Sequence, residues 1–78
     1  MIKELDTIVL SRDIPEYGLS RGDIGAVVHM YKGGNALEIE FVTGEGQTIG
    51  VVTLDARDVR PMHANEILHV RELKAAYQ

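Results

Sequence analysis

Glu38 and Glu40 are the residues of this 78-residue sequence whose types and spacing come nearest to acid–base chemistry. They alternate with apolar residues, so in a β-strand both carboxylates lie on one face, about 7 Å apart along the chain. Catalysis by such a pair requires a cleft that perturbs the pKa of a carboxyl group. A strand face in so short a chain is usually solvated. We therefore expect no catalytic residues and no enzyme.

The sequence also gives little support for a metal site or for a nucleophilic catalytic residue. His29, His63 and His69 contain no pair at the close spacing that places two imidazoles on one face of a helix or strand. Ser11 and Ser20 have no histidine nearby in sequence, and the glycine-rich turns lack the lysine and following helix of a phosphate loop. The chain has no cysteine, which excludes thiolate nucleophiles and sulfur-based zinc sites. We expect no metal and no cofactor.

Nucleic-acid binding needs a basic surface with exposed aromatic residues. The arginines that could form one, beside Tyr17 and Tyr31, are Arg12, Arg21, Arg57 and Arg60. Residues 1–62, however, hold ten acidic and six basic residues, and the net charge of the chain is −4. An acidic balance disfavours a surface that follows phosphates. We keep nucleic-acid binding as the alternative function.

The remaining candidates lie in the polar span 11–23. Arg21-Gly22-Asp23 spells an adhesion tripeptide, but we interpret it as a turn in which Gly22 supplies the bend and Asp23 caps backbone amides. Tyr17 falls at the tip of this span. It could line a peptide groove of the kind that SH3 domains use, or simply cap the end of the barrel.

The elements that position these residues are predicted by alternating apolar residues and by Gly-rich turns at Lys32–Asn35 and Thr43–Gly46. We expect strands at about 7–10, 24–31, 36–42, 48–54 and 59–61, a single helical turn at 54–58, and a close backbone approach or bulge at Gly25. The side chains expected to share a face are Ile8 with Leu10, Ala26 with Val28 and Met30, Leu37 with Ile39 and Phe41, and Ile49 with Val51.

Five strands with a long first loop and a short turn before the last predict an all-β, five-stranded SH3-like barrel over residues 1–62. Residues 63–78 are predicted to be a C-terminal helical extension, with Asn65 as the N-cap of an α-helix over residues 66–77. Apolar residues recur in it near the helical period, at Ile67, Val70 and Tyr77. This apolar stripe packs either on its own barrel or on a second molecule.

Several separated blocks of the sequence resemble the bacterial domain-of-unknown-function family 4926. They begin with Asp6-Thr7-Ile8-Val9 and Asp13-Ile14-Pro15-Glu16 and continue with Leu19-Ser20-Arg21-Gly22-Asp23-Ile24-Gly25-Ala26-Val27-Val28, Glu38-Ile39-Glu40-Phe41 and Val52-Thr53-Leu54 through Val59-Arg60-Pro61. The resemblance covers roughly residues 5–62. It implies an SH3-like barrel and no established activity, so it supplies no catalytic residues.

A looser resemblance is to the barrel domain of the nitrile hydratase β subunit. Its Pro-x-Tyr and Arg-Gly-x-x-Gly-x-Val run is matched by Pro15, Tyr17, Arg21, Gly22, Gly25 and Val27, with one residue more than usual between the tyrosine and the arginine. The metal centre of those enzymes belongs to the other subunit. The resemblance therefore implies a barrel that contacts another subunit, not an enzyme.

Together these observations predict a non-catalytic module that binds another protein or a second copy of itself, an accessory or antitoxin-like role being one form. The candidate partner-binding residues are Tyr17, Arg21, Ile67, Val70 and Tyr77. The charged N-terminus lacks the apolar run of a signal peptide, and no stretch approaches membrane-spanning length. We therefore expect a cytoplasmic protein without a membrane partner.

Overall fold

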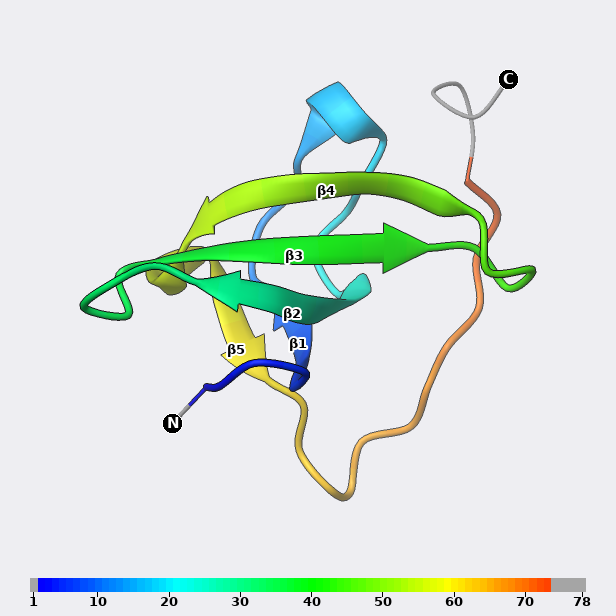
Figure 1. Cartoon of the computed structure of the whole chain (residues 1–78). Coiled ribbons are helices and arrows are strands. Elements are labelled where there is room, and N and C mark those ends of the chain that lie inside the picture. Colours follow the sequence, from blue (N-terminus) through cyan, green and yellow to red (C-terminus); the bar gives the residue numbers. More distant parts are fainter. Residues whose placement is uncertain (1, 74–78) are drawn as a thin grey trace.

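Five antiparallel strands make up the fold of residues 2–73, which are the residues that the computed structural model describes (Figure 1). The elements in chain order are β1 (Thr7–Leu10), the 3₁₀ helix η1 (Pro15–Tyr17), β2 (Ile24–Met30), β3 (Ala36–Val42), β4 (Thr48–Asp55), the 3₁₀ helix η2 (Ala56–Asp58) and β5 (Val59–Pro61). The five strands and η2 lie close to their predicted positions, whereas η1 forms within the span 11–23, which was predicted as a polar loop.

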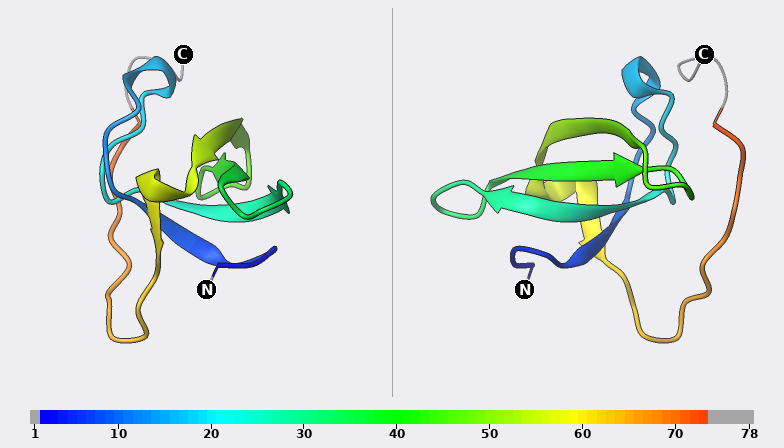
Figure 2. Two further views of the ribbon diagram at one scale, coloured as in Figure 1. Left: turned by 90° about the vertical axis from the view of Figure 1, so that its left-hand side faces the viewer. Right: turned by 45° about the vertical axis from the view of Figure 1, so that its right-hand side comes forward.

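The strands form one open sheet in the order β4-β3-β2-β1-β5. The predicted SH3-like barrel is therefore wrong, because a barrel closes only when the two outermost strands of the sheet hydrogen-bond to each other. Here η2 turns the chain after β4, and the three-residue β5 pairs with β1 alone. The sheet is strongly twisted instead, so that β1 and β5 run across the direction of β3 and β4 (Figures 1 and 2).

The core lies between the two halves of this twisted sheet. Phe41, Leu37 and Ile39 of β3 are almost fully buried, as their alternation predicts. The loop between β1 and β2 closes one end, where Ile14 and Leu19 are buried and the Ile14 N–H donates to the Leu19 carbonyl at 2.8 Å. The other members of this cluster are Ile8, Leu10, Val27, Val52, Leu54 and Val59.

In β2, the predicted shared face of Ala26, Val28 and Met30 is wrong. Val27 is the core residue, and Val28 is 41% exposed. The register against β3 shifts between Val27 and His29, which is a β-bulge, and this extra residue allows Met30 to pack on the core again. The bulge reverses the alternation within the strand, and no local sequence pattern marks its position.

In β4, the prediction that Val51 faces inward is also wrong, because its side chain is 49% exposed and Val52 is buried. Ile49 does pack against the core. The run of apolar and β-branched residues in this strand contains no alternation from which its inner face could be read.

The predicted C-terminal α-helix is absent from the described part of the chain. Ala64 and Asn65 form a turn, and residues 66–73 continue without regular secondary structure. A helix of this length is marginal unless its apolar face packs on a surface, and β-branched Ile67 and Val70 favour it little. Ion pairs of Glu66 with Arg60 and of Arg71 with Asp23 join this segment to the rest of the molecule. Among the described residues no helix is both long and apolar enough to cross a membrane.

Candidate interaction surface

Residues 62–73, which we call the C-terminal strap, leave β5, bend widely and return along the side of the sheet towards η1 (Figures 1 and 2). The strap is fixed first at Glu66. Its carboxylate accepts two hydrogen bonds from the Arg60 guanidinium, at 2.9 and 2.6 Å, and one from the His63 backbone N–H at 2.7 Å. These bonds, the Arg60 bonds above all, lower the pKa of Glu66 from 4.5 to about 2.

The second attachment of the strap is Arg71. Its Nε donates to Asp23 Oδ1 at 2.8 Å, and Nη2 donates both to the other Asp23 oxygen and to the Gly18 carbonyl, the latter at 3.0 Å. Burial raises the pKa of Asp23, but the hydrogen bonds from Arg71 and from the Ser20 N–H outweigh burial, and the net pKa is lowered. The strap is thereby joined to the loop between β1 and β2.

Between these two attachments the strap exposes three large apolar side chains. Ile67 is 89% exposed, Leu68 66% and Val70 90%. Two of them, Ile67 and Val70, are candidate partner-binding residues from the sequence, while the third candidate of that segment, Tyr77, lies outside the described residues. Leu68 is not among the predicted partner-binding residues, because it does not lie on the helical stripe that contains Ile67 and Val70.

Of the other two candidates, Tyr17 lies against Gly50 of β4. A Cβ atom placed on Gly50 would lie 3.2 and 3.3 Å from two ring carbons of Tyr17, so the ring fills the space of the missing side chain. This packing matches the capping interpretation of Tyr17, although the residue remains 38% exposed. Arg21 is exposed in the turn of the same loop, and its backbone N–H donates to Asp13 Oδ1 at 2.8 Å.

That turn matches the structural interpretation of the Arg21-Gly22-Asp23 tripeptide. Gly22 has φ +95°, in the left-handed region that glycine tolerates best, and Asp23 Oδ2 accepts from the Ser20 N–H at 2.8 Å. Asp23 has a second contact, with Arg71, that sequence reasoning missed. The two residues are 48 positions apart, and no sequence pattern links them.

The arginines do not form a free basic surface. Arg12 lies 3.1 Å from Asp58, Arg57 lies 3.2 Å from Asp55, and Arg60 binds Glu66. Of the four arginines considered for nucleic acid, Arg21 alone has no ion pair within residues 2–73. The two tyrosines are not neighbours either, because Tyr17 packs on Gly50 whereas Tyr31 hydrogen-bonds to Glu38.

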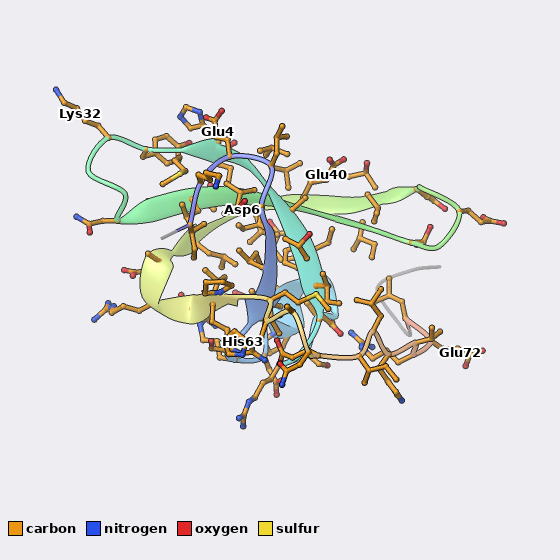
Figure 3. All side chains as sticks on the ribbon, turned by 90° about the horizontal axis from the view of Figure 1, so that it is seen from below. Glu4, Asp6, Lys32, Glu40, His63 and Glu72 are labelled. Atoms are coloured by element: carbon orange, nitrogen blue, oxygen red, sulfur yellow. The ribbon has the colours of Figure 1, made fainter. Side chains whose placement is uncertain are left out.

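The glutamate pair lies on the solvent face of β3. Glu38 accepts a hydrogen bond from the Tyr31 hydroxyl, and Glu40 accepts one from Thr48 Oγ1 at 2.9 Å. The bond to Glu38 raises the pKa of Tyr31, because the phenol proton stabilises the nearby carboxylate. Figure 3 shows Glu40 and Glu4 well away from His63. Within the described range, no three His, Asp or Glu side chains come together as metal ligands.

The sequence of residues 4–61 matches the model of the family described as a domain of unknown function, DUF4926. The chain belongs to this family. The match covers the whole sheet from the residues before β1 to the end of β5, and it stops immediately before the strap. No curated protein and no solved structure matches the chain.

Proposed function

We propose that this DUF4926 protein is a non-catalytic accessory module that binds another protein through the apolar side chains of the C-terminal strap, Ile67, Leu68 and Val70. The observation that carries the proposal is their exposure on a segment that ion pairs hold in place at both ends. Isolated exposed apolar residues are ordinary on protein surfaces. Three within four positions give a partner a short apolar segment to bury.

Burial of the strap side chains would favour such a contact. Burying one Val, Leu or Ile side chain completely contributes about 1.5–3 kcal/mol. The ordering of a flexible segment normally opposes binding, at about 0.5–1.5 kcal/mol per immobilised side chain, and backbone ordering adds to this. Because Glu66 and Arg71 already hold the strap, part of that entropic cost falls on folding and not on association. An extended apolar segment of this kind fits a groove or a sheet edge of a partner.

The alternative, nucleic-acid binding, has weaker support. A phosphate-binding surface needs cations that are free to replace counterions. Arg12, Arg57 and Arg60 each share their charge with a carboxylate. The acidic face formed by Glu38 and Glu40 would also repel phosphates.

The test is an affinity pull-down of the tagged full chain from a lysate of its source organism, followed by a salt wash and mass spectrometry. The chain carrying both Ile67→Ser and Val70→Ser is compared with a matched control carrying Val28→Ser and Val42→Ser, which removes exposed valines from the sheet face. We expect a stoichiometric protein that wild type and control retain and that the strap variant loses. Equal retention by the strap variant contradicts the proposal. Recovery of nucleic acid that washes off with salt supports the alternative.

A further inference from the structure

We propose that β4 is a pairing edge for a second copy of this chain, so that the β4 strands of two molecules align antiparallel across a two-fold axis and join two five-stranded sheets into one. The inference goes beyond the binding of another protein by the strap and uses a different surface. It rests on the free backbone groups of β4, on its lack of charge, and on the register that its own sequence allows.

The free backbone groups follow from the pairing of β3 with β4. The Ala56 N–H donates to the Asn35 carbonyl at 2.9 Å, and in an antiparallel ladder hydrogen-bonded pairs recur at every second residue. Gly50, Val52 and Leu54 therefore direct their backbone groups towards β3. Val51 and Thr53 direct theirs away from β3, and because β4 is the outermost strand of the sheet formed by residues 2–73, no other strand pairs with them.

The edge of β4 also lacks the features that keep edge strands apart. Proteins protect exposed edges with charged residues, proline or very short strands. The opposite edge, β5, has all three, with three residues that include Arg60 and Pro61. By contrast, β4 has eight residues, and Thr48–Leu54 contains neither a charge nor a proline. The edge of β4 therefore lacks the protection that the edge of β5 has.

The sequence of β4 fits a copy of itself. When Val52 lies opposite Val52 of the second copy, Val51 lies opposite Thr53, and both of these pairs are β-branched, which suits cross-strand contact. The same register places Gly50 opposite Leu54 of the second copy. The ring of Tyr17, which packs on Gly50, then borders the interface and loses part of its exposed surface.

Electrostatics permit this contact despite the net charge of −4. Asp55, at the end of the strand, is already neutralised by Arg57 at 3.2 Å. Glu40 lies in β3, one strand away from the edge, and the two copies of Glu40 would be three strand spacings apart, about 14 Å. That separation exceeds the screening length of about 8 Å at physiological ionic strength. A contact through the face that carries Glu38 and Glu40 would instead bring like charges together.

The first test is sedimentation equilibrium of the full chain from micromolar to millimolar concentration. We expect the wild-type mean mass to rise towards twice that of the monomer. Val51→Lys places a charge on the edge without entering the core and should keep the chain monomeric. Val28→Lys, at a valine of similar exposure on β2, is the matched control and should associate like wild type. A wild type that stays monomeric throughout, or equal loss of association in both variants, overturns the proposal.

Amide hydrogen exchange measured by NMR locates the contact. We expect the Val51 and Thr53 amides to exchange more slowly as concentration rises, while the Val52 amide, bonded to β3, is slow at every concentration. Concentration-dependent protection confined to the strap, or protection of β4 only when a different protein is added, would overturn pairing with a second copy. The strap variant with Ile67→Ser and Val70→Ser should still associate, which separates this proposal from the proposed function.

Discussion

Replacing Gly25 with alanine should destabilise the protein, because the methyl group has no space. A Cβ atom at this position would lie 2.5 Å from Ile39 Cγ2, 2.8 Å from Phe41 Cε1 and 3.1 Å from the Glu40 carbonyl oxygen. Carbon atoms in ordinary contact are about 3.5–4.0 Å apart, so the overlap with Ile39 is about 1 Å. Ile39 and Phe41 are 0% and 1% exposed and cannot move into solvent. Overpacking of this kind costs about 1–3 kcal/mol.

The measurement is the free energy of unfolding by urea titration, with the melting temperature as a second readout. Each kcal/mol should lower the melting temperature by about 4–8 °C in a domain of this size. Gly44→Ala is the matched control, since nothing lies within 4 Å of its added Cβ and its φ is not positive. It should be neutral or stabilising by up to about 1 kcal/mol. If Gly25→Ala is as stable as Gly44→Ala, the close packing of β2 on β3 is wrong.

Three further predictions concern the core and the strap. Phe41→Ala should lower the free energy of unfolding by about 3–5 kcal/mol in the same titration, and a mild effect would mean that β3 does not contribute to the core. Because the folded pKa of Glu66 lies below its ordinary value, its contribution to strap attachment is complete above pH 4.5 and is lost as the pH falls through about 2. An NMR titration of the Glu66 carboxyl carbon should therefore have its midpoint near 2, whereas a midpoint near 4.5 would show that the bonds to Arg60 do not form. Arg71→Gln should speed amide exchange in the strap while changing the free energy of unfolding by less than about 1 kcal/mol, as expected for an ion pair whose arginine remains partly exposed to solvent. Unchanged exchange would show that the strap is held elsewhere.

Much of the fold could be predicted because its signals are local. The alternation of Leu37, Ile39 and Phe41 with polar residues identifies both the β3 strand and its buried face, since side chains in a strand point alternately to opposite sides. A bulge or a close backbone approach is predicted at Gly25, and an added Cβ there would meet two side chains of β3 and, at 3.1 Å, the Glu40 carbonyl oxygen. The bulge after Val27 could not be predicted, because it depends on how two strands meet and not on either sequence alone.

The candidate site was predictable only in part. The sequence predicts that Ile67 and Val70 share the apolar stripe of a helix, whereas both are exposed on an extended strap. The three-residue spacing of Ile67 and Val70 can also occur in an extended segment, when side-chain contacts hold that segment in place. Those contacts, from Arg60 and Asp23, were not evident in the sequence.

The sequence by itself determined where strands and turns form, which residues can enter a core, and that the chain belongs to DUF4926, because these properties depend on neighbouring residues and on composition. Only the tertiary structure decided that the sheet stays open with β4 at its edge, and that residues 62–73 form a strap and not a helix. The Arg71 contact to the Gly18 carbonyl joins residues 53 positions apart. Such contacts form only after the sheet has brought distant segments together, so no periodicity within either segment can reveal them.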